Sequence, residues 1–350
     1  MILEGQGVKC MMKRFLAIFL SLVMLLSVFT ACGTNGANKT ETTAVTEPEE
    51  EAKVMKVLTL GSSSSVDSNH MINLVANAEG FDGELVIGTL YYSGCKLSQH
   101  VRFLTENSNV YSLYLSSTEN PNTQPNVIEG VTMRDALRQD YWDVVVLQAG
   151  VFECMDEDAY TNGNIQTIRQ YVKENTLNPL MVFGWHTVGV SSTDPDLIAT
   201  YKLTPNSYEK YAIEYNYDRV RMFKERVDLM ERYIMSDDSY VYVIASCTAM
   251  ENAITSYLGQ KGIKRDYTHT TDMGRLIAAY VWYAKLAGIE QLEEIKLDVI
   301  PKSFLKTTEN RMQDRVLTQL EKAVILEVVN NTLVNPLEIT PSQYTEAHAQ

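Results

Sequence analysis

A repeated alternation of short apolar runs and helical stretches is the feature that most constrains the fold of this chain. The apolar runs are rich in β-branched residues and predict strands. They are Val54–Leu60, Leu85–Thr89, Asp143–Leu147, Leu180–Phe183 and Tyr240–Ala245. The helical stretches among them are Ser68–Asn77, Met133–Gln139, Asn164–Glu174, Tyr208–Met235 and Ala249–Leu258. Such alternation predicts an α/β protein with a mostly parallel sheet and helices on both faces, a three-layer α/β/α sandwich.

The third strand supports this reading and indicates where a site should lie. Val144–Leu147 is apolar at every position, which is typical of a strand buried on both faces. In such sheets, ligands bind beyond the carboxyl ends of the strands. We therefore expect functional residues in the segments that directly follow strands. Residues 109–117 interrupt the alternation and could form a hairpin insertion.

The amino-terminal segment predicts export. Lys13 and Arg14 precede the apolar run Phe15–Val28, which is the pattern of a signal peptide. The run is shorter than the about 20 residues that span a bilayer comfortably. Small residues before Cys32 resemble the lipobox of bacterial lipoproteins, which implies cleavage before this cysteine and attachment of lipid to it. Ordinary signal cleavage, giving a secreted protein, and an uncleaved anchor are the alternatives; all three place the domain on the extracytoplasmic side.

Further segments are expected along the chain. Residues 33–53 are rich in Thr, Asn, Ala and Glu and predict a disordered acidic linker. One globular domain is expected over residues 54–290, with a helix at Asp272–Leu286 near its end. Residues 291–350 are expected to form a helical extension, with a helix near Gln313–Asn330, and a loose tail from Asn335.

Charge and cysteine content exclude some classes of function. The formal net charge of −14 argues against nucleic acid or anionic lipid surfaces as main partners, since both favour clustered Lys and Arg. No two of the five cysteines have C-x-x-C spacing, so neither a zinc motif nor a redox motif is indicated. Cys95, Cys154 and Cys247 are expected to be buried apolar residues.

A turn of glycine and serines follows the first predicted strand. Gly61 precedes Ser62, Ser63, Ser64 and Ser65, and a helical stretch comes next. A strand, a tight turn and a helix commonly present a nucleophile. A serine nucleophile needs a base, usually a histidine that is oriented by a carboxylate.

Among the five histidines, His269 stands out because Asp266 lies three residues before it. This spacing lets a carboxylate and an imidazole from one turn approach each other. We predict that this pair meets the serine turn in space. The alternatives at this point are a flexible polar loop for the serines and a helix cap for Asp266.

These stretches resemble the blocks of the SGNH (GDSL-like) hydrolase superfamily, and most closely its DUF4886-type branch. Gly61–Ser65 resembles the first block and places the nucleophile at Ser63. Ser93-Gly94-Cys95, followed by His100, resembles the second block, and Asp143–Gln148 resembles the third. Asp266-Tyr267-Thr268-His269 resembles the D-x-x-H block. The sequence departs from the family pattern at Ser62, where Asp or Asn is usual, and at Gln148, where Asn is usual.

The resemblance implies a flavodoxin-like sheet and an ester hydrolase with a Ser63–His269–Asp266 triad. It also implies an oxyanion hole built from the backbone N–H groups of Ser63 and Gly94 and from the side chain of Gln148. A small-molecule or carbohydrate ester, such as an O-acetyl group, is the implied substrate. No cofactor and no metal are expected.

Several alternatives remain open from the sequence. His100, Trp185 and His186 could line a substrate cleft or could belong to the core. A non-catalytic carbohydrate- or ligand-binding lipoprotein with the same fold is the second hypothesis for function. A metal-dependent hydrolase using Asp67 and His70 beside the D-x-x-H pair is disfavoured, since no motif such as H-x-x-x-H is present.

Overall fold

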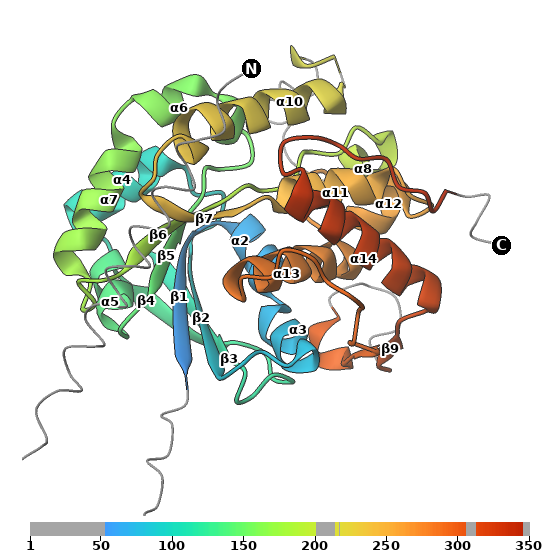
Figure 1. The fold of residues 1–350 in the computed structure, drawn as a ribbon. Helices are drawn as coiled ribbons and strands as arrows, with labels where there is room; N and C mark the ends of the chain where they lie inside the picture. The colour runs from blue at the N-terminus through green and yellow to red at the C-terminus, as the bar shows by residue number, and fades with distance from the viewer. Residues whose placement is uncertain (1–52, 201–213, 217, 306–312, 346–350) are drawn as a thin grey trace, which may run out of the picture. The chain divides into compact units, whose positions relative to one another are not determined.

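The computed structural model describes residues 53–200, 214–216, 218–305 and 313–345 (Figure 1). The signal peptide, Cys32 and almost all of the expected linker lie outside these residues. From residue 52 onward the chain forms one compact unit. No helix within the described ranges is long and apolar enough to cross a bilayer.

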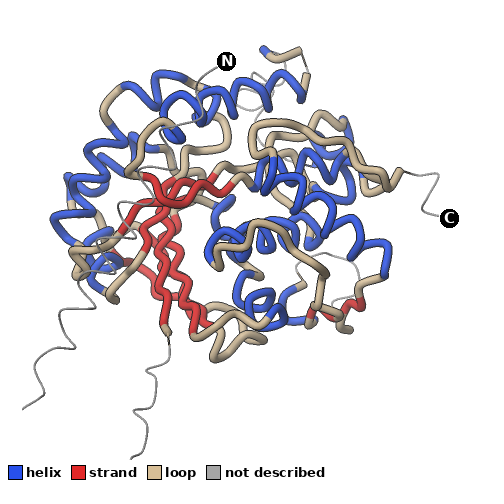
Figure 2. Tube along the Cα trace, viewed as in Figure 1, coloured by secondary structure: helices blue, strands red, loops and turns tan. Residues whose placement is uncertain are grey.

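A seven-stranded sheet runs through the centre of this unit, in the order β4-β3-β2-β1-β5-β6-β7 (Figure 2). The strands are β1 (Val54–Gly61), β2 (Glu84–Tyr91), β3 (Tyr111–Ser117), β4 (Asn126–Val131), β5 (Val144–Leu147), β6 (Val182–His186) and β7 (Tyr240–Ile244). The pairs β2–β1, β1–β5, β5–β6 and β6–β7 are parallel. β3 and β4 are antiparallel and extend the edge beyond β2.

Helices cover both faces of the sheet (Figure 1). They are α2 (Ser63–Asn69), α3 (Ile72–Glu79), α4 (Leu97–Glu106), α5 (Met133–Arg138), α6 (Glu157–Thr161), α7 (Asn164–Asn175), α8 (Pro195–Thr200), α10 (Arg219–Met230), α11 (Ser246–Ile254), α12 (Gly259–Ile263), α13 (Asp272–Leu286) and α14 (Gln319–Val334). Short helical turns lie at Glu153–Met155 and Lys302–Phe304, and a π-helical turn at Glu231–Met235 follows α10. A second, two-stranded sheet pairs β8 (Val299–Ile300) with β9 (Arg315–Val316).

Alternate strand residues divide the interior into two cores. Val144 and Val146 of β5 point into the core that contains α3, α11, α13 and α14. Val145 and Leu147 point into the core that contains α4, α5, α7 and α10. A strand has a side-chain period of two, so a strand that feeds two cores must be apolar throughout. The predicted three-layer α/β/α fold is confirmed.

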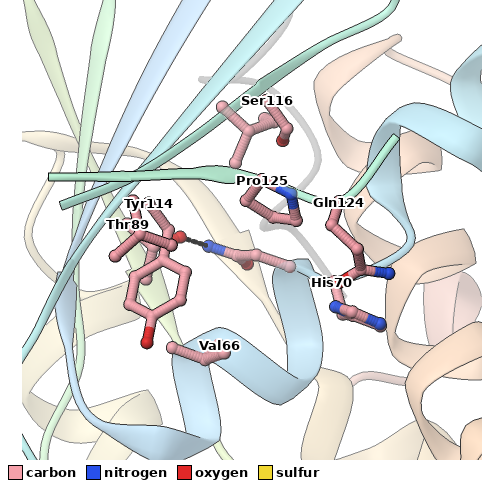
Figure 3. Close-up of a pocket in the computed structure, with 10 residues that line it drawn as sticks. Val66, His70, Thr89, Tyr114, Ser116, Gln124 and Pro125 are labelled. Atoms are coloured by element: carbon pink, nitrogen blue, oxygen red, sulfur yellow. Dashed lines mark hydrogen bonds between the residues drawn. The ribbon is translucent and has the colours of Figure 1, made fainter. Parts of the chain in front are cut away.

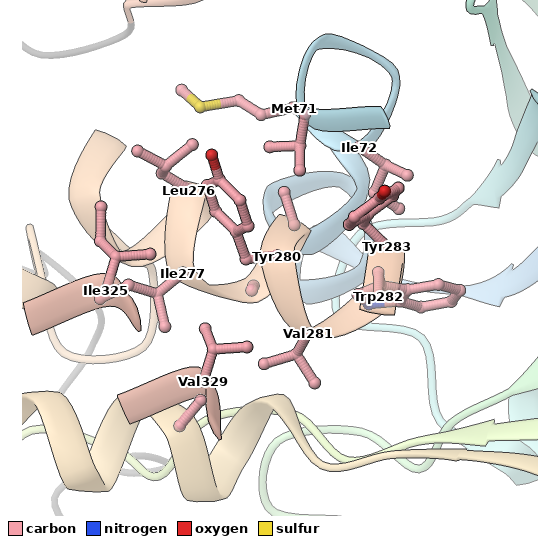
Figure 4. Close-up of a cluster of buried hydrophobic side chains, with 14 of the residues drawn as sticks. Met71, Ile72, Leu276, Ile277, Tyr280, Val281, Trp282, Tyr283, Ile325 and Val329 are labelled. Atoms are coloured by element: carbon pink, nitrogen blue, oxygen red, sulfur yellow. The ribbon is translucent and has the colours of Figure 1, made fainter. Parts of the chain in front are cut away.

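Helix α13 forms the centre of the first core. Its Leu276, Ile277 and Val281 are fully buried, and Figure 4 shows them beside Ile325 and Val329 of α14. Residues well beyond position 290 therefore share a core with β1 and β5. The expected boundary at residue 290 does not separate two cores.

The carboxyl-terminal tail is also part of the packed unit. The N–H of Thr340 donates to Asn252 Oδ1 at 2.7 Å, and the N–H of Tyr257 donates to the carbonyl of Tyr344 at 2.8 Å. Ser342 is buried. The expectation of a loose tail is wrong for residues 335–345, because their backbone groups are bonded to α11 and to the loop that follows it.

Several element boundaries differ from those predicted. The helix expected at residues 68–77 is two helices, α2 and α3, and the first begins five residues earlier. β6 begins at Val182, and Leu180 is 85% exposed in the preceding turn. The helix expected at residues 208–235 is described from Arg219, and residues 208–213 lie outside the described ranges. Residues 109–117 do not form a hairpin by themselves: they contain the single strand β3, which pairs with β4 to extend the main sheet.

Candidate active site

The turn after β1 requires glycine at its first position. A Cβ atom on Gly61 would lie 1.9 Å from Ser65 Oγ and 2.9 Å from Gln148 Cδ, far inside van der Waals contact. After this close approach, α2 begins at Ser63, and the N–H of Ser65 donates to the carbonyl of Ser62 at 3.0 Å. The turn therefore places Ser63 in the first turn of a helix, at the carboxyl edge of the sheet.

Ser63, His269 and Asp266 are in hydrogen-bonding contact. His269 Nε2 lies 3.0 Å from Ser63 Oγ, and His269 Nδ1 lies 2.9 Å from Asp266 Oδ2. Both Ser63 and His269 are partly exposed. The carboxylate favours the tautomer with the proton on Nδ1, so that Nε2 can accept the proton of the serine hydroxyl.

The carboxylate of Asp266 is held in place by its own loop. The backbone N–H groups of Thr268 and His269 donate to Asp266 Oδ1 at 2.9 and 2.8 Å. Burial acts to raise the pKa of Asp266, but these bonds and the His269 ring outweigh it and lower the pKa to about 2. Asp266 is therefore ionised at neutral pH and can stabilise a positively charged imidazole.

Asp67 joins the loop of His269 to the helix of Ser63. This buried residue of α2 accepts hydrogen bonds from Arg275 Nε and Nη2 at 3.1 and 2.8 Å, and from the N–H of Thr270 at 3.0 Å. Burial acts to raise the pKa of Asp67, but Arg275 and Arg265 lower it below its usual range. The ionised carboxylate therefore fixes the segment that follows His269 against the serine helix.

Sequence reasoning missed this role of Asp67 and considered the residue only as a metal ligand. One signal was present. Asp67 follows Ser63 by four residues, so both lie on the same side of α2. A carboxylate at that position faces whatever segment approaches the serine.

Gln148 lies beneath the serine turn. Ser65 Oγ donates to Gln148 Oε1 at 2.6 Å, and Gln148 Nε2 donates to Ser62 Oγ at 3.1 Å. All three side chains are buried. The side-chain amide of Gln148 thus holds the turn in place through hydrogen bonds with Ser65 and Ser62. Whether the second amide hydrogen also stabilises an oxyanion stays a prediction.

Gly94 lies at the same edge of the sheet as Gly61. Tyr91, the last residue of β2, pairs in register with Gly61, and the exposed Gly94 follows three residues later. Its φ angle is +60°, which strongly favours glycine. The N–H of Cys95 closes this turn on the carbonyl of Tyr92 at 3.2 Å. The position of Gly94 is compatible with a role in the oxyanion hole, and this role stays a prediction.

Of the two alternatives for His100, Trp185 and His186, the structure favours the core over a substrate cleft, because each is only 1% exposed. His100 Nδ1 lies 2.8 Å from the hydroxyl of Tyr111, and Trp185 packs on aromatic rings of the second core. His186 Nδ1 lies 3.1 Å from Gln148 Oε1. Burial lowers the pKa of His100 to about 4 and that of His186 to about 3, so both rings are neutral at pH 7.

The residues considered for a metal site do not converge. Asp67 is enclosed by Arg275 and Thr270, and His70 Nε2 lies 2.9 Å from the carbonyl of Phe304. Among the described residues, no group of three His, Cys, Asp or Glu side chains is arranged to hold a metal ion.

The three cysteines of the domain are free and buried, as predicted. Burial raises the pKa of the Cys247 thiol to about 12. It therefore stays protonated at neutral pH and is not a candidate nucleophile.

Comparison with known proteins identifies the family. The model of DUF4886, a domain of unknown function, matches residues 56–300, well over half of the chain. The chain belongs to the DUF4886 family. This confirms the family resemblance that the sequence blocks indicated. No curated protein matches the chain.

Solved structures include a second DUF4886 protein with the same fold. It comes from Bacteroides uniformis and shares 20% identity, with a TM-score of 0.66 over 84% of this chain and all of that one. A proposed SGNH hydrolase from Slackia heliotrinireducens shares 15% identity, with a TM-score of 0.39 over 67% of this chain and all of that one. The salicylyl-acyltransferase SsfX3 of a tetracycline biosynthetic pathway shares 17% identity, with a TM-score of 0.33 over 69% of this chain and 56% of that one.

Proposed function

We propose that this DUF4886 protein is a serine ester hydrolase. The observation that carries the proposal is the contact of one imidazole with two partners, 3.0 Å from Ser63 Oγ and 2.9 Å from Asp266 Oδ2. Both distances are within reach of direct proton transfer, about 2.6–3.2 Å between heavy atoms. A hydroxyl, a base and an ionised carboxylate in this order are the parts that nucleophilic acyl transfer needs.

The proposed reaction has two halves. Ser63 Oγ attacks the carbonyl carbon of the ester while its proton passes to His269 Nε2. The tetrahedral intermediate then collapses, His269 protonates the departing alcohol, and the acyl group stays on Ser63. Water next attacks the acyl carbon as His269 removes its proton, and the proton returns to Ser63 as the acid leaves.

Asp266 is a positioning residue in this scheme. It does not take the proton itself, since its low pKa keeps it ionised beside the imidazolium. Oxyanion donors are assigned to the backbone N–H groups of Ser63 and Gly94 and to Gln148. Loss of one such donor typically lowers kcat about 10²- to 10³-fold.

The substrate is proposed to be an ester on a small molecule or carbohydrate outside the cytoplasm, such as an O-acetyl group. The export signal and Cys32 support the location, and the family resemblance supports the reaction class. The competing function, a binding protein with this fold that does not turn over substrate, makes a different prediction for an activated ester.

Hydrolysis of p-nitrophenyl acetate by the full-length chain tests the proposal. Ser63→Ala should abolish turnover above background, whereas Ser64→Ala should retain it. Ser64 is a matched control because it is the next residue of the same helix and, like Ser63, is partly exposed. Absence of turnover in the parent protein, or equal turnover in Ser63→Ala, would reject the assignment.

A further inference from the structure

A cavity of about 200 Å³ lies beside α2, and none of the three residues of the proposed triad lines it (Figure 3). Strands β2, β3 and β4 and the loop before β4 complete its wall. Its lining residues are Val66, Asn69, His70, Ile87, Thr89, Tyr114, Ser116, Gln124, Pro125 and Val127. In Figure 3 the ring of Tyr114 lies on one side of the cavity, and His70 and Gln124 lie on the other.

The cavity is close to the proposed nucleophile along the helix. Val66 follows Ser63 by three residues and His70 follows it by seven, so these residues share one face of the α2 segment. Val66 is therefore one helical turn from Ser63. A ligand in the cavity would lie next to the helix that presents the serine hydroxyl.

The wall combines apolar and polar groups, and it carries no Asp, Glu, Lys or Arg among the described residues that form it. Thr89, Tyr114 and Ser116 supply hydroxyls, and Asn69 and Gln124 supply amides. Ser116 Oγ already accepts from Asn73 Nδ2 at 2.8 Å, so its own hydrogen remains available to a ligand. Such a wall offers hydrogen bonds without a counter-charge and suits an uncharged polar ligand.

Asn69 contributes an acceptor without a partner to this wall. The residue is only 6% exposed, and its Nδ2 donates to Thr59 Oγ1 and Thr89 Oγ1, both at 2.9 Å. Its Oδ1 is buried and has no hydrogen-bond partner among the described residues, which is unfavourable. Because Oδ1 is closed off in this structure, a ligand hydroxyl would bond to it only after the side chain turns toward the cavity.

Size restricts the ligand further. Cavities for drug-sized ligands span about 300–1,000 Å³. This one, at about 200 Å³, has room for one small ring and not for an oligosaccharide. An aromatic side chain next to hydroxyl and amide groups suits a ring that has an apolar face and a rim of hydroxyls.

We propose that this cavity binds a single uncharged, polyhydroxylated ring, and that it holds the sugar part of the ester substrate. The second half of this statement rests on the proposed function. The first half does not, because binding of the ring requires neither Ser63 nor His269.

Binding is measured by calorimetric titration of the full-length Ser63→Ala protein with D-glucose, D-galactose and D-xylose. A small ligand of this kind should bind with a dissociation constant in the millimolar range for at least one sugar. Glucose 6-phosphate and glucuronate should bind more weakly, because the wall offers no cationic side chain.

Replacement of either of two valines by tryptophan tests whether the sugar binds in this cavity. Val127→Trp places an indole in the cavity and should weaken binding about tenfold or more. Val110→Trp is the matched control, because Val110 and Val127 are both 41% exposed and Val110 does not line the cavity. The control should bind like the parent. Absence of saturable binding of every neutral sugar, tighter binding of the charged ones, or unaltered binding in Val127→Trp would overturn the proposal.

A kinetic measurement connects the cavity to turnover. In the protein with Ser63 intact, Val127→Trp should raise KM for the acetate ester of the sugar that binds, and Val110→Trp should not. Sugar binding without any esterase activity would reject the proposed function and keep the cavity as a sugar site. Esterase activity without sugar binding would reject the cavity and keep the hydrolase.

Discussion

At the residue scale, the candidate site depends on how one imidazole is oriented. Asp266 receives two backbone hydrogen bonds and faces His269 Nδ1, so the ring presents Nε2 to Ser63. In the proposed reaction, the carboxylate acts through the histidine and does not touch the substrate. Its removal should therefore change the rate without changing the position of the serine.

Asp266→Asn is the substitution that isolates this effect. The amide keeps the shape of the side chain but favours the wrong imidazole tautomer, so kcat for an aryl acetate should fall about 10⁴-fold. KM should change little, and the circular dichroism spectrum should match that of the parent. A kcat within a factor of about ten of the parent would contradict the proposed role of Asp266.

The low pKa of Asp266 also predicts how stability depends on pH. The pKa is lowered in the folded state to about 2, against an unfolded value of about 3.9. The group therefore stabilises the fold above the unfolded pKa, and this contribution is lost as pH falls through the folded pKa. Between about pH 5 and pH 2, the parent should lose more stability than Asp266→Asn does.

Urea unfolding at several pH values measures this difference. Asp82→Asn, at an exposed position, is the control and should follow the parent. Parallel pH profiles of Asp266→Asn and the parent would show that the Asp266 carboxylate is not specially stabilised in the folded state.

Sequence reasoning reached Ser63, His269 and Asp266 because a D-x-x-H loop and a glycine-serine turn are local patterns. It did not reach the bracing role of Gln148, since Ser62 and Ser65 lie more than 80 positions away. It left His100, Trp185 and His186 open between a substrate cleft and the core. A residue type near a strand end does not reveal which face of the sheet its side chain meets.

At the element scale, an ion pair fastens α13 to α2. Arg275 lies at 1% exposure between Asp67 of α2 and Asp272 of its own helix, at 2.8 and 2.7 Å. This pairing sets the start of α13, and hence the loop of His269, relative to the helix of Ser63. The two catalytic segments are therefore joined by charge as well as by packing.

Arg275→Leu should be severely destabilising. It removes the guanidinium that Asp67 and Asp272 share, and loss of one partner of a buried pair costs about 3–5 kcal/mol. Among the described residues, Asp67 then keeps only its longer ion pair with Arg265, at 3.3 Å. The matched control is Arg232→Leu, which removes exposed pairs with Asp228 and Glu157 and should change stability little. Equal midpoints of urea unfolding for the two variants would contradict the structural role assigned to Arg275.

The strands that the sequence predicted best are short runs rich in β-branched apolar residues. β1, β5 and β7 were found within a residue or two, because such a run favours a strand over a helix or a loop. β4 was not found, since most of its residues are exposed and it carries Asn, Glu and Gly. The start of α2 was missed because four serines resemble a loop, and only the close approach of Gly61, Ser65 and Gln148 makes them the beginning of a helix.

At the scale of the whole molecule, the alternation of strands and helices along the chain was sufficient to predict a sheet between two helical layers. The packing of residues 292–305 and 313–345 could not be predicted in this way. Their contacts with α11 include backbone hydrogen bonds, which leave no pattern in the sequence. The cavity beside α2 could not be predicted from the sequence either, because its wall combines residues from a helix, three strands and a loop.

Attachment to a membrane is a prediction for the whole molecule that rests on Cys32. The full-length chain, produced in a bacterium that processes lipoproteins, should incorporate labelled palmitate and sediment with membranes. Cys32→Ala should lose the label, whereas Cys10→Ala should keep it, because Cys10 lies within the expected signal peptide, residues 1–32, upstream of the cleavage before Cys32. Label in the Cys32→Ala protein would contradict lipidation at this position.

Covalent labelling of the folded, full-length protein with a fluorophosphonate, followed by mass spectrometry of its peptides, tests directly whether Ser63 is an activated nucleophile. Ser63 should be the one modified residue, and both Ser63→Ala and His269→Ala should lose the label. Modification of Ser62, Ser64 or Ser65 in place of Ser63, or undiminished labelling of His269→Ala, would contradict the assignment.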